Sequence, residues 1–364
     1  MSEQRTVLIM AGGTGGHIFP AISIAEKLQE LGMHVEWLGS SAGLELQILG
    51  KTRIPLHLIS ARGLRGKGLR SLFAAPFMIL QATGQALRVI KQVDPDCVLG
   101  MGGFVTGPGG VAARLRGKKL LVHEQNAVPG VTNKILARMA FKVLQAFPGT
   151  FPARENVETV GNPVRQTISR LSAGRNFQGD RPLHILVLGG SQGAQAINQV
   201  VPLALAEWSG EAVKHQVMHQ TGRGKLGETV TGYSQAGHRD SDDLNITEFI
   251  DDMAQAYEWA DIVVCRSGAS TVAELAAAGM PAILVPYPYH RDQQQLKNAR
   301  WLEGAGAAQI IEQQDLTAET LRQKLIELAK DRQRLSAMSK AARSIAIVDA
   351  DSRISLICQE AANV

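Results

Sequence analysis

A strand followed by a glycine turn occurs twice in this chain, about half its length apart. Residues 6–16 (TVLIMAGGTGG) and 184–193 (HILVLGGSQG) each run from apolar residues into paired glycines, a hydroxyl residue and a further glycine. Glycine has no Cβ, so backbone N–H groups can approach a ligand closely, and the N-terminus of a following helix attracts anions. The repeat therefore predicts two α/β domains that bind phosphates or sugars.

The length and the order of apolar segments favour the same architecture. A chain of 364 residues is too long for one ordinary core. Short, continuously apolar runs alternate with longer amphipathic stretches, which is typical of parallel strands buried on both faces. We expect the α/β class, with two doubly wound, Rossmann-like parallel-sheet domains facing a cleft. The predicted strands after the first glycine turn are 34–38, 54–59, 97–100, 120–123 and 143–146, and those after the second are 213–220, 244–250, 261–265, 281–285 and 308–311.

Proline and glycine mark the boundary between the two domains. Several prolines and glycines occur within residues 147–163 (FPGTFPARENVETVGNP), and such residues interrupt regular helices and strands. The segment is therefore predicted to be a hinge. We expect a first domain over 1–162 and a second over 163–345. A final helix, at about 346–364, is expected to pack back on the first domain.

Composition indicates a globular protein of a reducing compartment. Apolar residues make up 45% and charged residues 20%. The first apolar run has only five residues, too few for a signal peptide or a membrane span, which predicts a cytoplasmic protein. Cys97, Cys265 and Cys358 are widely spaced in apolar surroundings and are expected to be reduced, buried thiols.

Charge is distributed unevenly. Residues 1–162 carry 18 basic and 10 acidic side chains, whereas the remainder carries 20 and 23. Residues 46–93 hold eight Lys or Arg and no acidic residue, interleaved with bulky apolar side chains. The segment is either a surface for an anionic partner or a solvated helix face.

The first glycine loop does not match the common nucleotide motifs. A dinucleotide fingerprint starting at Gly13 would need glycine at Ile18, and a phosphate-binding P-loop would need Gly-Lys-Ser/Thr. Glu36 precedes further strand residues, whereas a ribose-binding acid belongs at the strand end. His17 follows the last glycine and is either a general base or a partner for the neighbouring loop.

Three further segments place polar or flexible residues after strands. Residues 100–110 (GMGGFVTGPGG) could wrap a phosphate or only turn tightly, and 123–126 (HEQN) are polar at a strand end, where open α/β sheets bind ligands. Residues 265–274 (CRSGASTVAE) lead into a helix whose N-terminus could hold a diphosphate. Glu274 could bind a ribose diol, but its spacing from Thr271 favours a capping box.

No metal cofactor is expected. Asp-x-Asp pairs occur at Asp94/Asp96, 240/242 and 349/351, so the pattern is unspecific. Asp94 and Asp96 precede their strand and are expected to be turn residues.

Seven segments in order closely resemble the MurG family, the bacterial N-acetylglucosaminyltransferases of peptidoglycan synthesis. They are AGGTGGH at 11–17, GMGGFVTGPGG at 100–110, HEQN at 123–126, GNPVR at 161–165, GGSQGA at 189–194, EFIDDM at 248–253 and CRSGASTVAE at 265–274. The resemblance implies a GT-B fold. It also implies inverting transfer of N-acetylglucosamine from UDP-N-acetylglucosamine to the 4-hydroxyl of lipid I, giving lipid II.

The resemblance implies residue roles as well. His17 is the expected general base, with Glu124 in reserve, and the helix N-terminus near Ser270 with Arg165 and Arg266 is expected to stabilise the leaving diphosphate. Glu274 would bind ribose besides any capping. The implied donor contacts are Thr14, Gly15, Gly16, Asn126, Arg165, Ser191, the Ile250 backbone, Ala269, Ser270, Thr271, Val272, Ala273, Glu274 and Gln295. The implied acceptor-side residues are Gly102, Gly103, Phe104, Thr106 and Asn133.

Two positions depart from the family pattern. Phe104 stands where related chains often have tyrosine, which removes any acid role for a phenol there. Residues 287–291 form a segment one residue longer than usual. Which of Gln293, Gln294 and Gln295 meets the sugar therefore stays open.

A lipid-linked acceptor stays in an anionic bilayer, so the basic segment would serve to bind that membrane. Each Lys or Arg near such a surface contributes about 1 kcal/mol to the binding free energy. We expect peripheral binding to the cytoplasmic face of the inner membrane, with other cell-wall synthesis proteins as partners and no nucleic acid. The predicted membrane patch comprises Arg62, Arg65, Lys67, Arg70, Leu72, Phe73 and Phe77.

Two other functions stay open. A UDP-N-acetylglucosamine 2-epimerase would share the two-domain architecture without needing a lipid acceptor. A non-catalytic nucleotide-sugar sensor at the membrane would tolerate loss of His17.

Overall fold

A computed structural model describes residues 4–363 except 14, 42, 44, 51, 62–68, 172–176, 178–180, 207, 209–213, 239–242 and 291. The side chains of residues 69–74 are likewise outside the described part. The chain forms two compact units, which are treated separately below. Unit 1 comprises Met1–Pro163 with Asp349–Val364, and unit 2 comprises Val164–Val348.

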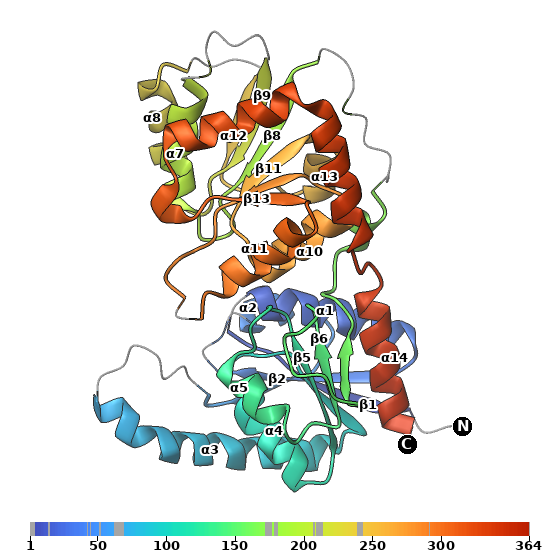
Figure 1. The fold of residues 1–364 in the computed structure, drawn as a ribbon. Coiled ribbons are helices and arrows are strands. Elements are labelled where there is room, and N and C mark those ends of the chain that lie inside the picture. Colours follow the sequence, from blue (N-terminus) through green and yellow to red (C-terminus); the bar gives the residue numbers. More distant parts are fainter. Residues whose placement is uncertain are drawn as a thin grey trace. The chain divides into compact units, whose positions relative to one another are not determined.

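Unit 1 is built on a parallel sheet of seven described strands in the order β3-β2-β1-β4-β5-β6-β7 (Figure 1). The strands are β1 (Thr6–Met10), β2 (His34–Ser40), β3 (Leu56–Ile59), β4 (Cys97–Gly100), β5 (Lys119–Glu124), β6 (Lys142–Gln145) and β7 (Val157–Thr159). The helices are α1 (Gly15–Glu30), α2 (Glu45–Leu49), α3 (Leu69–Val93), α4 (Thr106–Leu115), α5 (Val131–Leu136) and α14 (Ala350–Asn363).

Alternation along the strands places apolar side chains on both faces of this sheet. Val7 and Ile9 of β1 pack in one core with α1 and α14, whereas Leu8 and Met10 pack in another with α3, α4 and α5. The final helix thus contributes Ile354, Cys358 and Ala361 to the core of unit 1. This explains why the strands are apolar at nearly every position.

Unit 2 repeats the design with six described parallel strands in the order β10-β9-β8-β11-β12-β13 (Figure 1). The strands are β8 (Leu183–Leu188), β9 (His215–Gln220), β10 (Leu244–Thr247), β11 (Ile262–Cys265), β12 (Ala282–Leu284) and β13 (Ala308–Ile310). The helices are α6 (Gln166–Ser169), α7 (Gln195–Ala206), α8 (Leu226–Gln235), α9 (Met253–Trp259), α10 (Ala269–Ala278), α11 (Gln294–Gly304), the 3-10 turn η1 (Gln313–Asp315), α12 (Ala318–Lys330) and α13 (Arg332–Ser344).

The predicted α/β class with two parallel sheets is confirmed, and one element was missed. β7 lies inside the segment 147–163 that we predicted to be a hinge, and it pairs with β6. Val157 and Thr159 are half-buried and Glu158 is exposed, so β7 carries no continuous apolar signal. The three cysteines are buried free thiols, as predicted.

Glycine backbone packs directly on glycine backbone in the loops of unit 1. Gly103 has a φ of +86°, and a Cβ there would lie 2.2 Å from the carbonyl oxygen of Gly12. A Cβ on Gly102 would lie 2.9 Å from the His17 ring. The loops after β1 and β4 can therefore interlock only without side chains at these positions.

The loops of unit 2 meet in the same way and are joined by buried polar side chains. A Cβ on Gly222 would lie 2.3 Å from the Cα of Gly193. Gln220 accepts from the N–H of Gly190 at 3.0 Å and donates to the carbonyl of Glu248 at 2.9 Å. Loops after β8, β9 and β10 are thereby fixed to one another.

A buried chain of hydrogen bonds supports these loops from below. Asn198 Nδ2 donates to the carbonyl of Thr221 at 2.9 Å, and its Oδ1 accepts from His219 Nε2 at 3.1 Å. His219 Nδ1 then accepts from the Tyr233 hydroxyl at 2.9 Å. Burial lowers the pKa of His219 to about 3, so its imidazole is neutral at physiological pH.

We predict that Gly103→Ala lowers the stability of unit 1 by at least about 2–3 kcal/mol, because it combines left-handed backbone with a clash against Gly12. Gly117→Ala is the matched control, since Gly117 has a φ of +70° and a Cβ there would meet nothing within 4 Å. That control should cost about 1 kcal/mol. Calorimetric unfolding compares the two, and equal losses would contradict the interlocking of the loops.

We predict that acid destabilises unit 2 through His219. The unfolded imidazole binds a proton below its ordinary pKa of 6.5, whereas the folded one does so only near 3. Its contribution is therefore complete above pH 6.5 and is lost as the pH falls, by roughly 2–3 kcal/mol between pH 6.5 and 4.5.

The measurement is urea unfolding at both pH values, followed by the fluorescence of Trp208, Trp259 and Trp301, which all belong to unit 2. His219→Gln should show a flatter dependence on pH than the parent protein. An equally steep dependence in the variant would rule out His219 as the cause.

Candidate functional site

His17 lies in the first turn of α1, at the carboxyl edge of the sheet of unit 1. Its Nδ1 is 3.0 Å from Oε1 of Gln125, which follows β5. Gln125 also donates from Nε2 to the carbonyl of Met101 at 2.9 Å. The loops after β1, β4 and β5 thus converge on the imidazole, and both interpretations of His17, as base and as loop partner, stay compatible with this contact.

Glu124 is buried and engaged by four donors. Its Oε1 accepts from the backbone and side chain of Asn126 at 3.0 and 3.2 Å. Its Oε2 accepts from Gly130 N at 3.0 Å and from Asn133 Nδ2 at 2.9 Å. A carboxylate held this way organises the loop from residue 126 to 133, so the geometry does not support the reserve-base role expected of Glu124.

Two of the expected acceptor-side residues are also turned into the protein. Thr106 is fully buried, and its hydroxyl contacts the carbonyls of Gly102 and Met10 at 2.7 and 3.2 Å. Asn133 is 3% exposed and donates to Glu124. Both side chains thus support the loops of unit 1, and their expected contact with the acceptor stays a prediction. Phe104, in contrast, is 51% exposed beside Gly103.

The remaining predicted residues of unit 1 lie at the same edge. Gly15 and Gly16 begin α1, and Asn126 follows β5, while Thr14 lies outside the described residues.

Sequence reasoning missed a buried carboxylate in this region. Glu45, at the start of α2, is fully buried and accepts from Ser40 N at 2.6 Å and from Gly13 N at 3.3 Å. A Cβ on Gly12 would lie 2.8 Å from its Oε1. In the sequence, the only hint of this buried carboxylate is the presence of glycines at 12, 39 and 43, where a side chain would collide with Glu45.

In unit 2, the loop after β11 leads into α10 without the predicted capping box. The N-cap is Gly268, which has no side chain to make a capping hydrogen bond. Thr271 lies inside the first turn, so the capping interpretation of Glu274 is wrong. A Cβ on Gly268 would meet only Thr271 Oγ1, at 3.7 Å, so the protein's own packing does not require glycine there.

Glu274 instead joins two neighbouring side chains. Its Oε1 accepts from Arg165 NH2 at 3.3 Å, and its Oε2 accepts from the Tyr257 hydroxyl at 3.1 Å. Burial raises the pKa of Glu274, and Arg165 and Tyr257 oppose this shift. The Arg165 side chain is 53% exposed, so it can also meet an anion beside the N-terminus of α10.

Arg266 is committed elsewhere, which argues against its expected role toward the leaving group. Its guanidinium donates to the carbonyl of Val285 at 3.0 Å and to Oε1 of Gln313 at 2.6 Å. Burial lowers its pKa. The arginine thus ties the loop after β12 to the segment after β13.

The other predicted donor residues lie on loops or at helix starts at the carboxyl edge of unit 2. Ser191 is exposed in the loop after β8, and Ile250 is half-buried after β10. Gln295 Oε1 accepts from Tyr287 N at 2.9 Å, and Gln294 donates to Asp292 at 3.0 Å. Gln293 is exposed, with a φ of +50°. Ala269, Ser270, Val272 and Ala273 belong to the first turns of α10.

The pair Asp94/Asp96 makes the contacts expected of turn residues at the amino ends of the strands. Asp96 accepts from Arg5 and from Thr6 N, each at 2.8 Å, and Asp94 pairs with Lys118 at 2.7 Å. Within the described ranges, no group of three His, Cys, Asp or Glu side chains could hold a metal ion. Among the same residues, no helix has the length and apolarity needed to span a bilayer.

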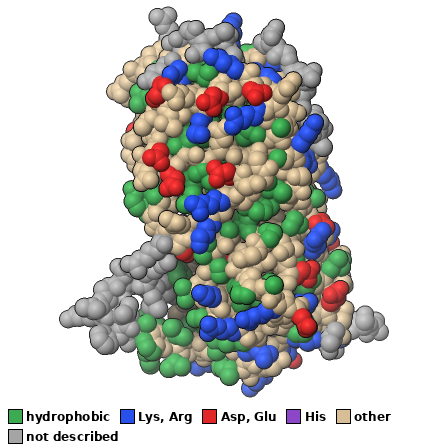
Figure 2. Space-filling view, viewed as in Figure 1, with side chains coloured by type: hydrophobic (Ala, Val, Ile, Leu, Met, Phe, Trp, Pro, Cys, Tyr) green, Lys and Arg blue, Asp and Glu red, His purple; other side chains and the backbone are tan. Residues whose placement is uncertain are grey.

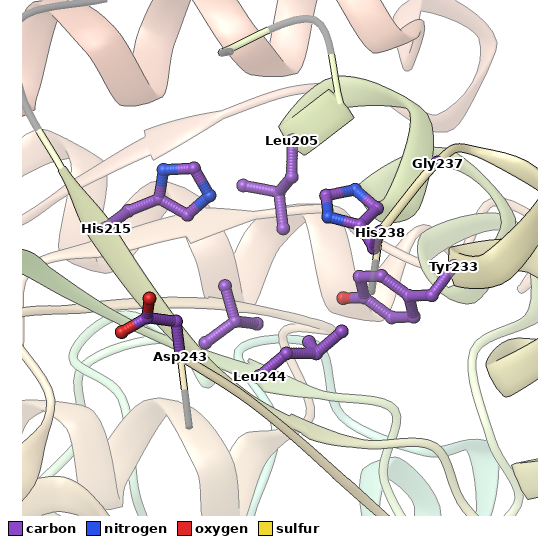
Figure 3. Close-up of a pocket in the computed structure, with 8 residues that line it drawn as sticks. Leu205, His215, Tyr233, Gly237, His238, Asp243 and Leu244 are labelled. Atoms are coloured by element: carbon purple, nitrogen blue, oxygen red, sulfur yellow. The ribbon is translucent and has the colours of Figure 1, made fainter. Parts of the chain in front are cut away.

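A cavity of about 240 Å³ in unit 2 lies away from this edge (Figure 3). His215 and Leu244 begin β9 and β10, so the cavity opens at the amino ends of the strands. Figure 3 shows the His215 and His238 rings on either side of Leu205. The predicted donor loops are at the opposite strand ends and contribute nothing to its lining, which is Leu205, His215, Val217, Tyr233, Gly237, His238, Asp243 and Leu244.

Comparison with known proteins assigns the family. Residues 7–145 match the glycosyltransferase family 28 N-terminal domain, and residues 184–354 match the corresponding C-terminal domain. The crystal structure of Acinetobacter baumannii MurG superposes with a TM-score of 0.82 at 42% identity, covering 98% of this chain and 99% of that one. A crystal structure of a UDP-N-acetylglucosamine 2-epimerase, 15% identical with a TM-score of 0.64, covers 97% of this chain and 95% of its own and shares the fold alone.

A curated relative from Marinobacter nauticus is 48% identical over 100% of this chain and 99% of its own length. It is named UDP-N-acetylglucosamine–N-acetylmuramyl-(pentapeptide) pyrophosphoryl-undecaprenol N-acetylglucosamine transferase. The chain therefore belongs to the MurG family of glycosyltransferase family 28, with the GT-B fold.

Proposed function

We propose that this protein transfers N-acetylglucosamine from UDP-N-acetylglucosamine to the 4-hydroxyl of lipid I, with inversion at the anomeric carbon, and so makes lipid II. Family membership over the full length supports this activity. The observation that links the activity to named residues is the N-terminus of α10, which begins after Gly268 and has the Arg165–Glu274 ion pair in its second turn. Unit 2 would bind the donor and unit 1 the lipid-linked acceptor.

The geometry of α10 suits a nucleoside diphosphate sugar. A helix start that follows a glycine N-cap can present N–H groups and the positive end of the helix dipole to phosphate oxygens. Arg165 adds a full positive charge there, and Glu274 offers carboxylate oxygens to a ribose diol. As the bond to the sugar breaks, negative charge grows on the diphosphate, where these groups stabilise it.

His17 is the proposed general base. Its Nδ1 is occupied by Gln125, and its Nε2 would take the proton of the attacking hydroxyl. Gly15, Gly16, Thr14 and Asn126 would add contacts to the donor, and Phe104, Gly102 and Gly103 would meet the acceptor. Because two fixed cationic elements, Arg165 and the start of α10, serve the diphosphate, we propose that the reaction needs no metal.

We predict that the protein forms lipid II from UDP-N-acetylglucosamine and lipid I in detergent, equally with and without EDTA. His17→Ala should lower kcat by about 10² to 10⁴, the usual contribution of a positioned base. His34→Ala is the matched control, because His34 lies at the start of β2 and contacts Glu36.

Product analysis distinguishes the alternatives. Conversion of donor alone to the manno sugar would indicate the epimerase. Full activity in His17→Ala would remove His17 from catalysis, and absence of turnover despite donor binding would favour the sensor.

We also propose that unit 1 docks on an anionic membrane at the cytoplasmic face of the inner membrane, where it would meet its lipid acceptor and other cell-wall synthesis proteins. Arg62, Arg65 and Lys67 of the expected patch lie outside the described residues, as do the side chains of Arg70, Leu72 and Phe73. Phe77 and Leu80 of α3 are each 71% exposed, and Val131 of α5 is 72% exposed. In Figure 2, hydrophobic side chains gather at the lower left, next to Lys and Arg side chains.

We predict that reversing Arg65, Lys67 and Arg70 to Glu weakens binding to anionic vesicles at least tenfold, because each basic residue contributes about 1 kcal/mol near such a surface. Reversal of Arg170, Arg334 and Lys340, exposed residues of unit 2, changes the net charge equally and is the control. Co-sedimentation with vesicles measures both. Unchanged partitioning of the first variant would refute the docking surface.

A further inference from the structure

Gln125 is held in one orientation by its neighbours. Its Nε2 lies 2.9 Å from the carbonyl oxygen of Met101 and 3.0 Å from Nδ1 of His123. The reversed amide would place its oxygen against the Met101 carbonyl, where two acceptors would repel. The Nε2 group therefore faces Met101 and His123, and Oε1 faces His17.

His123 fits this orientation from the other side. Its Nε2 lies 2.9 Å from the carbonyl of Gly161, so that nitrogen carries the proton and Nδ1 accepts from Gln125. His123 is fully buried, and burial lowers its pKa to about 4. A neutral His123 keeps the same hydrogen-bond pattern throughout the physiological range.

The amide orientation determines where the proton of His17 sits. Oε1 of Gln125 can only accept, so His17 Nδ1 must donate across the 3.0 Å contact. The neutral ring then carries its lone pair on Nε2. A Cβ on Gly102 would lie 2.9 Å from both Cε1 and Nδ1 of the ring, so only glycine leaves room for the imidazole in this position.

Among the described residues, no carboxylate contacts His17 Nδ1, the ring nitrogen opposite the one that would take the proton. Glu124 adjoins Gln125 in sequence but is committed to Asn126, Gly130 and Asn133. Glu45 accepts from Gly13 and Ser40. The group that contacts His17 Nδ1 is an amide, which fixes a tautomer without adding charge.

We propose that Gln125 is a positioning residue that holds His17 in the Nδ1–H tautomer, with His123 and the Met101 carbonyl fixing the amide. The proposal rests on the transferase function above. In that reaction the acceptor oxygen bonds to the anomeric carbon, and its proton passes to His17 Nε2. The bond from that carbon to UDP breaks, and UDP leaves with the electron pair.

The direct test is the tautomer of His17 in the full-length protein without substrates. Two-bond ¹H–¹⁵N correlation spectra distinguish protonated from bare imidazole nitrogens, and His17→Ala assigns the signals. We expect the Nδ1–H form in the unaltered protein. Finding mainly the Nε2–H form would overturn the proposal, whatever the activity of the enzyme.

The functional test is Gln125→Met, which keeps the side-chain length and removes the amide. We expect the Nε2–H form of His17 to become substantial and kcat to fall at least tenfold, with KM for UDP-N-acetylglucosamine changing less than twofold. An unchanged tautomer or an unchanged kcat in a folded variant would overturn the proposal.

Gln145→Met is the matched control for loss of a buried amide. Gln145 is 6% exposed on the adjacent strand β6 and makes two hydrogen bonds, to Phe151 N and Thr159 Oγ1, each at 2.9 Å. It should leave the His17 tautomer and kcat unchanged at similar cost in stability. If the unaltered protein has the Nδ1–H form but makes no lipid II, the transferase function fails while the role of Gln125 in setting the tautomer stands.

Discussion

The close approach of glycine backbone to glycine backbone at the carboxyl edge of each sheet is the constraint on which the site depends. Gly103 against Gly12 and Gly222 against Gly193 bring successive loops closer than any side chain would allow. This packing sets where α1 and α7 begin and which atoms they present. A Cβ at these positions would force the loops apart and so change the geometry of the site even in the protein without ligand.

Buried polar side chains then fix the loops in one arrangement. Glu45 and Gln220 accept from backbone N–H groups of the glycine-rich loops after β1 and β8, and Glu124 accepts from Gly130 in the loop after β5. A buried carboxylate is costly unless such donors surround it, so these contacts select one loop conformation over others. A residue such as Glu124, which its sequence motif suggests to be catalytic, can therefore have the structural role of holding a loop in place.

The two units place different chemistry on the same architecture. Around His17 the partners are neutral, namely the amide of Gln125 and the imidazole of His123. Beside α10 the partners are charged, with Arg165 paired to Glu274. A neutral imidazole suits the removal of a hydroxyl proton, and a cationic helix start suits a departing diphosphate. In the proposed reaction, unit 1 thus handles the proton and unit 2 the negative charge.

The sequence alone determined the α/β class, the two parallel sheets and most strands, because continuous apolar runs and glycine turns are local signals. It also pointed to the loops around His17, Glu124 and Glu274. Only the tertiary structure decided what each of these side chains contacts. Glu124, Thr106 and Asn133 are buried and hydrogen-bonded within the loops of unit 1. Arg266 joins two loops of unit 2, and Glu274 pairs with Arg165 instead of capping its helix. The orientation of Gln125 likewise needed Met101 and His123 in place. The partners Met101 of Gln125, Arg165 of Glu274 and Gln313 of Arg266 come from segments distant in sequence, so the spacing of residues along the chain does not predict them.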